Sequence, residues 1–185
     1  MPNLQQRKNT LCGIDEAGRG PLAGDLVIAG VILKQEIEGL MDSKKLSEKK
    51  RELLYELIIK HSDYNIVSFS PKEIDSKGLS LCLNEGLEMI KEKLTADIYL
   101  FDGNQTFGVL GINTLVKADT KIAEVSAGSI LAKVTHDRAI IRASKKYPLY
   151  GFEKHKGYGT KAHILAIKEH GYCDIHRRSF KIKTL

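Results

Sequence analysis

Four acidic residues stand where this chain could build a metal site. Asp15 and Glu16 follow a short apolar stretch, Asp102 directly follows another, and Asp119 repeats the pattern further along. One carboxylate at the end of a strand usually caps a helix or forms a turn, because an unpartnered charge is costly in apolar surroundings. Carboxylates that converge repel one another unless a cation lies between them, and such oxygen ligands suit Mg²⁺ or Mn²⁺. If the four side chains meet in the fold, they predict a divalent-metal site.

Two such ions, about 4 Å apart, can hydrolyse a phosphodiester bond because they activate a water molecule and stabilise the leaving oxygen. The charge balance agrees with an anionic substrate, since 29 Lys and Arg against 23 Asp and Glu give a net charge of +6 over 185 residues. Many basic proteins bind no polyanion, so the charge alone does not select nucleic acid. Ser/His/Asp catalysis has no supporting Gly-x-Ser-x-Gly motif in the chain. Metal-dependent phosphodiester hydrolysis is the chemistry that these residues favour.

A glycine-rich loop follows the first two acids and ends at Gly24. Gly13 and Gly18 have the spacing of a nucleotide-binding P-loop, but Arg19 and Gly20 stand where that motif requires Lys and Ser or Thr. Acids inside the loop would also repel phosphates, so the sequence excludes a P-loop. Two interpretations remain open. The loop is a flexible hairpin turn, or its glycines let the backbone approach a ligand closely while Arg19 fixes the loop or binds a phosphate.

Basic residues gather in two places. The clusters are Lys44, Lys45, Lys49 and Lys50, and Lys154, His155, Lys156 and Lys161. A solvated helix face is the usual explanation for such runs, above all for Lys49 and Lys50. The second cluster differs, because Tyr158 sits among glycines and cations in a predicted loop. An aromatic ring there can stack on a sugar or base while the cations meet phosphates, although a packing role for Tyr158 fits the sequence as well. Of the six histidines, His155 is the one that we place near the site.

The elements that must position these residues alternate between strand and helix patterns. We predict strands at 11–15, 25–33, 65–69, 98–101 and 110–116, and helices at 47–60, 71–77, 80–94, 123–146 and 161–169. The first two strands are close enough in sequence to pair as a hairpin, which places the glycine-rich loop at one end of the sheet. This order of elements predicts one α/β domain around a mixed central sheet flanked by helices.

Composition and cysteine usage limit the class of protein. The three cysteines, Cys12, Cys82 and Cys173, are scattered and form no Cys-x-x-Cys pair, which argues against a disulfide framework and for a reducing compartment. The first residues carry charges with no apolar run behind them, unlike a signal peptide. No window reaches the roughly 18 apolar residues of a membrane span. We expect a cytoplasmic protein with no membrane association.

Six blocks of this chain stand out as motifs, and they are GIDEAGRGP (13–21), DSKKL (42–46), DGN (102–104), KAD (117–119), SAGSILAK (126–133) and HKGYGT (155–160). Together, and in this order from about residue 11 to residue 180, they resemble bacterial ribonuclease HII, a type 2 ribonuclease H. We expect no additional N-terminal domain of the ribonuclease HIII kind, so that related family is disfavoured. The resemblance implies a ribonuclease H-like fold as a single catalytic domain over 1–185, with a C-terminal helical, substrate-binding extension at about 148–185.

The resemblance also implies an activity and the residues that carry it. The expected enzyme cleaves the RNA strand of RNA–DNA hybrids and incises 5′ of single ribonucleotides embedded in duplex DNA, leaving 3′-hydroxyl and 5′-phosphate ends, to remove misincorporated ribonucleotides. The implied metal-binding catalytic acids are Asp15, Glu16, Asp102 and Asp119, with two Mg²⁺ or Mn²⁺ ions. The implied substrate contacts are Gly18, Arg19 and Gly20 at the ribose 2′-hydroxyl and Tyr158 on the neighbouring deoxyribose. Lys44, Lys45 and Lys156 are further expected substrate contacts, and the family acts as a monomer.

Two other functions stay open at the level of sequence. One is a ribonuclease H-like nuclease that acts on DNA alone. The other is a non-catalytic RNA–DNA hybrid-binding module, which has no need of four acids, since acids in a nucleic-acid groove weaken binding when no metal is present.

Overall fold

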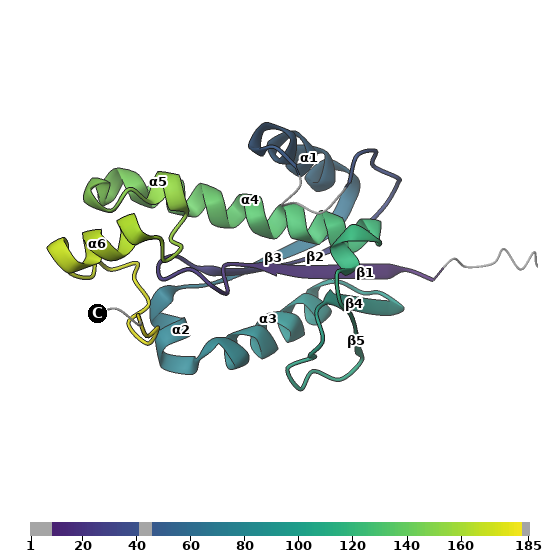
Figure 1. The fold of residues 1–185 in the computed structure, drawn as a ribbon. Coiled ribbons are helices and arrows are strands. Elements are labelled where there is room, and N and C mark those ends of the chain that lie inside the picture. The colour runs from purple at the N-terminus through teal and green to yellow at the C-terminus, as the bar shows by residue number, and fades with distance from the viewer. Residues whose placement is uncertain (1–8, 41–45, 183–185) are drawn as a thin grey trace, which may run out of the picture.

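The structure, a computed structural model, describes residues 9–40 and 46–182, and a mixed β-sheet lies at its centre (Figure 1). The described strands form one five-stranded sheet in the order β3-β2-β1-β4-β5. They are β1 (Leu11–Ala17), β2 (Leu26–Leu33), β3 (Ser62–Phe69), β4 (Ile98–Asp102) and β5 (Ile112–Leu115). The helices are α1 (Glu48–His61), α2 (Pro71–Lys77), α3 (Leu79–Lys93), α4 (Ala123–Lys146), α5 (Phe152–His155) and α6 (Lys161–His170), with 3₁₀ turns η2 (Ala118–Thr120) and η3 (Pro148–Tyr150). The predicted α/β class is confirmed.

Strand β1 lies in the middle of the sheet and sets its mixed character. It pairs antiparallel with β2, as the hairpin predicts, with Asp15 opposite Ala29. On its other side it pairs in parallel with β4, with Ile14 opposite Phe101. Because β1 and β4 run in the same direction, the next residue on each strand also lies side by side with its neighbour. These two residues are Asp15 on β1 and Asp102 on β4.

Helices cover both faces of the sheet, which explains the continuous apolar sequence of β2. Its residues alternate between two cores, because successive side chains of a strand point to opposite faces. Leu26 and Ile28 pack into the core on the α3 side, while Val27, Ala29 and Val31 pack into the core under α4 and α1. Figure 1 shows α4 running along one face of the sheet and α3 along the other.

Helix α4 lies very close to the sheet because glycine occupies the contact. A Cβ atom added at Gly128 would come within 3.0 Å of the Ala29 carbonyl oxygen and 3.3 Å of the Asp15 nitrogen. Both are backbone atoms, so only a shift of the helix could relieve these close contacts. This approach brings the residues that follow Gly128 on α4 next to Asp15.

Replacing Gly128 with Ala should therefore destabilise the protein. Alanine favours a helix over glycine by about 1 kcal/mol. Overpacking against the rigid backbone should outweigh that gain and leave a net loss of about 1–2 kcal/mol. Chemical denaturation of the two proteins measures the difference. A variant as stable as the parent would show that the contact between α4 and β1 can accommodate the added methyl group.

The C-terminal part of the chain forms a separate packing unit beyond the end of the sheet. Elements η3, α5 and α6 lie near the C-terminal end of α4 (Figure 1). Their apolar cluster contains Ala23, Ile140, Tyr150, Phe152 and Ile167, so it joins this unit to both the glycine-rich loop and α4.

No helix among residues 9–40 and 46–182 combines the length and the apolar character that crossing a membrane requires.

Two histidines buried in this C-terminal unit predict a pH dependence of stability. Burial and, to a smaller extent, the charges of His163, Arg178 and His155 together lower the pKa of His176 to about 4. Burial likewise lowers the pKa of His163. An unfolded histidine has a pKa of about 6.5, so below that pH the unfolded chain takes up protons before the folded one.

The stabilisation from a neutral His176 is therefore complete above pH ~6.5 and is lost as the pH falls toward 4, by up to about 1.4 kcal/mol per pH unit. Denaturant unfolding of the parent and of His176→Gln at pH 7, 6 and 5 isolates this contribution from that of the carboxylates. The parent should lose stability more steeply than the variant, and parallel slopes would contradict the assignment.

Candidate active site

Three of the four predicted acids meet at the edge of the sheet. Asp15, Asp102 and Asp119 each offer a carboxylate oxygen, and these oxygens all lie within 4.8 Å of one another. Asp15 and Asp102 come from the neighbouring strands β1 and β4, and Asp119 comes from the turn η2. The Ala118 N–H donates to Asp102 Oδ1 at 3.0 Å and so fastens this turn to the end of β4.

The positions of two of these acids differ from the expectation. Asp15 lies inside β1, which continues to Ala17, instead of at the end of a strand. Asp119 lies on η2, because β5 already ends at Leu115. Strand β1 is longer than its apolar stretch because its hydrogen bonds to β2 continue through Ala17, opposite Val27.

The electrostatics of the cluster favour a bound cation. Asp15 is 7% exposed, and burial raises its pKa well above the ordinary value, with the nearby charges of Glu16 and Asp102 adding to the effect. Hydrogen bonds from the Glu16 N–H, 2.7 Å from Asp15 Oδ1, and from the Ser129 side chain oppose that shift. Three carboxylates crowded in a poorly solvated site repel one another, and a divalent cation would relieve the repulsion. The donor set is all oxygen, so it fits Mg²⁺ or Mn²⁺.

Glu16 lies beside this group but is oriented differently. Its Oε1 accepts a hydrogen bond from Arg19 Nη1 at 3.2 Å, while its Oε2 is buried without a hydrogen-bond partner among the described residues. Burial raises the pKa of Glu16, and the Arg19 charge only partly offsets that rise. Glu16 is not among the three residues whose oxygens converge within 4.8 Å, but it lines the same cavity as Asp15, where its unpartnered Oε2 is a further carboxylate oxygen.

The glycine-rich loop forms one wall of a cavity that Asp15 and Glu16 also line. Gly18 has φ +94°, and a Cβ there would lie 2.4 Å from the Asp25 carbonyl oxygen, so only glycine fits. Gly20 faces Tyr158, since a Cβ at Gly20 would lie 3.5 Å from Tyr158 Cε1. The cavity measures about 320 Å³, and its described lining is Asp15, Glu16, Ala17, Gly18, Arg19, Gly20, Ser129, Lys133 and Tyr158.

Two of these lining residues, Ser129 and Lys133, were not singled out by sequence reasoning. They stand one turn apart on α4, and Lys133 Nζ pairs with Asp137 Oδ1 at 2.9 Å. Their signal in the sequence is the spacing of four between two polar residues on a helix face that otherwise carries small and apolar side chains. It is a weak signal, because nothing near α4 in sequence shows that this face meets Asp15.

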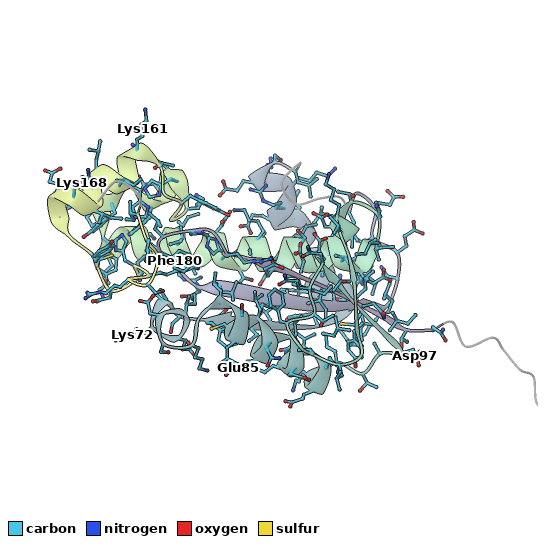
Figure 2. All side chains as sticks on the ribbon, turned by 60° about the horizontal axis from the view of Figure 1, so that its bottom comes forward. Lys72, Glu85, Asp97, Lys161, Lys168 and Phe180 are labelled. Atoms are coloured by element: carbon cyan, nitrogen blue, oxygen red, sulfur yellow. The ribbon has the colours of Figure 1, made fainter. Side chains whose placement is uncertain are left out.

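The other predicted contacts are not part of the described cavity lining. Lys44 and Lys45 fall outside the described residues. Lys156 has φ +49° and donates from Nζ to the Glu153 carbonyl, and among the described residues it is not part of the cavity lining. His155 stacks on His163 behind the Tyr158 loop and likewise does not line the described cavity, because its ring packs into the C-terminal unit. Lys161 projects from the start of α6 into solvent, away from the rest of the molecule (Figure 2).

Known proteins match this chain along almost its whole length. A family model described as Ribonuclease HII matches residues 12–183. Ribonuclease HII of Sulfurovum sp. (strain NBC37-1) is 61% identical over 182 residues, which cover 98% of this chain and 97% of the relative. Ribonuclease HII of Aliarcobacter butzleri (strain RM4018) is 58% identical, over 95% of this chain and 92% of the relative.

Two solved structures share the fold. A chain from the PCNA:RNase HII complex of Archaeoglobus fulgidus superposes with a TM-score of 0.81 at 30% identity, covering 95% of this chain and 97% of its own. The ribonuclease H2 of Pyrococcus horikoshii OT3 superposes with a TM-score of 0.79 at 29% identity, covering 93% of this chain and 94% of its own. The arrangement of the sheet and helices described above is that of these proteins.

Proposed function

Because this chain belongs to the ribonuclease HII family, it is a ribonuclease H endonuclease that acts on RNA–DNA hybrids, and we propose how its own residues divide that work. The proposal has two parts. One group of side chains holds divalent metal at the scissile phosphate. A second group recognises the sugar next to it. The observation that carries it is the convergence of three aspartate oxygens within 4.8 Å, since Asp15 of this group lines the same cavity as the glycine-rich loop and Tyr158.

Asp15, Asp102 and Asp119 would hold the metal, and Glu16 would contribute its unpartnered Oε2. Bound Mg²⁺ or Mn²⁺, as a pair of ions, supplies Lewis-acid stabilisation of phosphate charge and a more acidic water molecule. The chain's own contribution is to fix the ligand oxygens. The Ser129 side chain and the Glu16 N–H both hydrogen-bond to Asp15, and the Ala118 N–H holds Asp102.

Recognition of the ribonucleotide falls to the glycine-rich loop and Tyr158, which face each other across the cavity. Only the 2′-hydroxyl distinguishes ribose from deoxyribose. Gly18 and Gly20 leave the backbone of the loop open to that hydroxyl, while Arg19 is held beside the acids by Glu16. Tyr158 is 45% exposed, so its ring is free to stack on the adjoining deoxyribose. If the loop and Tyr158 bind the sugar while the metal binds the phosphate next to it, cleavage falls on the 5′ side of a lone ribonucleotide.

The same proposal covers the rest of the chain. Residues 1–185 form a single catalytic domain in which about 148–185 are a substrate-binding extension, because this part carries Tyr158. Lys44, Lys45 and Lys156 are assigned to the phosphates of the substrate, and the protein acts as a cytoplasmic monomer.

A three-substrate assay tests this function. The protein is incubated with Mg²⁺ or Mn²⁺ and an RNA–DNA hybrid, a DNA duplex with one ribonucleotide, or an all-DNA duplex, each beside an EDTA control. We expect metal-dependent cleavage of the first two and none of the third. Cleavage of all-DNA would identify a DNA nuclease, and tight hybrid binding without cleavage would identify a binding module.

A further inference from the structure

One short segment contacts the glycine-rich loop directly and is connected to Tyr158 through one further residue; the loop and Tyr158 together are the proposed sugar reader. We call residues 173–177 the clasp segment. Its backbone pairs with the glycine-rich loop, since the Gly24 N–H donates to the Ile175 carbonyl at 2.8 Å and the Arg177 N–H donates to the Leu22 carbonyl at 2.8 Å. His176 and Arg177 stand next to each other in this segment and are both nearly inaccessible, with 2% and 1% exposure.

His176 is connected to Tyr158 through a second histidine. The Cys173 N–H donates to His176 Nδ1 at 2.9 Å, His176 Nε2 lies 3.0 Å from His163 Nε2, and His163 Nδ1 lies 2.9 Å from the Tyr158 carbonyl oxygen. These contacts form one continuous chain of hydrogen bonds from the clasp segment to the backbone of the tyrosine.

The neighbours of the two rings fix their protons. A carbonyl only accepts, so His163 Nδ1 carries a hydrogen. A backbone N–H only donates, so His176 Nδ1 carries none. Two neutral rings then leave a single arrangement, in which His176 Nε2–H donates to His163 Nε2. The lowered pKa values of both histidines agree with neutral rings at neutral pH. Every ring nitrogen of the pair is used, and the last donor of the chain points at Tyr158.

Arg177 holds the other half of the reader. Its Nε donates to the Gly24 carbonyl at 2.9 Å and its Nη1 to the Arg19 carbonyl at 3.4 Å, so one guanidinium joins both ends of the glycine-rich loop. The ring of Phe180 lies 5.0 Å from this guanidinium, at the place where the C-terminal unit meets the body of the molecule (Figure 2). A buried charge is costly, and here it is directed at the backbone of the loop.

We propose that His163, His176 and Arg177 are positioning residues that set the separation between Tyr158 and the glycine-rich loop, and thereby the selectivity for a lone ribonucleotide in DNA. This inference rests on the proposed roles of Tyr158 and the loop. None of the three is in the described lining of the cavity that Asp15, Glu16, the loop and Tyr158 share, so they act through the residues that they hold.

Two substitutions of His163 separate its two hydrogen bonds. In His163→Asn, the amide nitrogen takes the place of Nδ1 and can still donate to the Tyr158 carbonyl. In His163→Gln, the longer amide reaches toward His176 and leaves that carbonyl without its donor. We expect His163→Gln to lower kcat/KM on a duplex with one ribonucleotide by ~10-fold, and less on a long RNA–DNA hybrid, because small displacements of a positioning group are costly. His163→Asn should recover most of the loss. Glu169→Gln, on the solvent side of the same helix, is the matched control.

Combining His163→Gln with Tyr158→Ala decides whether the effect passes through Tyr158. Without the ring there is nothing left to position, so His163→Gln should change kcat/KM less than ~2-fold in that background. An equal loss of kcat/KM in both backgrounds would show that His163 has only a structural role and would overturn the positioning proposal. A Tyr158→Ala protein with unchanged selectivity would instead overturn the stacking role of Tyr158, and with it the positioning proposal that depends on that role. If His163→Gln fails to fold, His176→Asn replaces it, because that side chain still accepts from Cys173 but no longer reaches His163.

The Arg177 half has its own variant. In Arg177→Lys the single ammonium cannot span the Gly24 and Arg19 carbonyls as the guanidinium does. We expect the selectivity, taken as kcat/KM on a duplex with one ribonucleotide relative to kcat/KM on a long RNA–DNA hybrid, to fall by ~10-fold. Unchanged selectivity in a folded variant would remove Arg177 from the proposal.

Discussion

Replacing Asp102 with Asn is expected to lower the rate of RNA–DNA hybrid cleavage by ~10³-fold or more, because a metal contributes several kcal/mol to the stabilisation of phosphate charge. The amide removes one negative ligand from a cluster in which the oxygens of Asp15, Asp102 and Asp119 lie within 4.8 Å of one another. It keeps an oxygen for the Ala118 N–H, so the fold at the end of β4 should persist. Binding of the hybrid should stay within ~3-fold, since phosphate contacts to basic residues supply most of that affinity.

Single-turnover cleavage and fluorescence anisotropy of a labelled hybrid separate the two effects. Asp63→Asn is the matched control, because that carboxylate is 58% exposed in a surface ion pair with Lys34 on the sheet edge away from the site. Full cleavage by Asp102→Asn would remove Asp102 from the metal site. A joint loss of binding and cleavage would mean that the substitution acts on the substrate groove instead of the metal.

Replacing Tyr158 with Ala should lower kcat/KM on a duplex with one ribonucleotide by about 5- to 150-fold, the equivalent of the ~1–3 kcal/mol that stacking on an aromatic ring contributes. The long hybrid should suffer less, and Mn²⁺ binding followed by electron paramagnetic resonance should not change. The ring is 45% exposed, so its loss leaves no core cavity. Tyr64→Ala, which removes a 37% exposed ring from the edge strand β3, is the control. Equal losses on all substrates would contradict the stacking role.

Much of the fold could be predicted because local signals agree with tertiary packing. Helix α4 has the predicted bounds, 123–146, since its apolar spacing is long and Pro148 follows it. Ser47 and Ser70 cap α1 and α2 close to where the predicted helices begin, and Ser70 does so in a complete capping box. The hairpin of β1 and β2 follows from two apolar stretches separated by one short loop.

The site could be predicted only in part, because its geometry depends on contacts that are distant in sequence. Asp15 and Asp102 are 87 residues apart in the sequence, and only the parallel register of β1 and β4 brings them side by side. Ser129 and Lys133 enter the site because Gly128 lets α4 approach β1, which no local pattern reveals. The His163–His176 pair depends on a turn at the end of the chain that carries neither helical nor strand periodicity. The family resemblance supplied roles for Gly18, Gly20 and Tyr158 that residue types alone left open.

Moving one ribonucleotide along an otherwise all-DNA duplex tests most directly whether one cavity both binds metal and selects the sugar. For each position, the cut site and the chemistry of the ends are mapped after incubation with Mg²⁺ or Mn²⁺. We predict a single cut that follows the ribonucleotide, always on its 5′ side, with a 3′-hydroxyl and a 5′-phosphate. Cuts that stay in place as the ribonucleotide moves, or that persist in EDTA, would contradict the account.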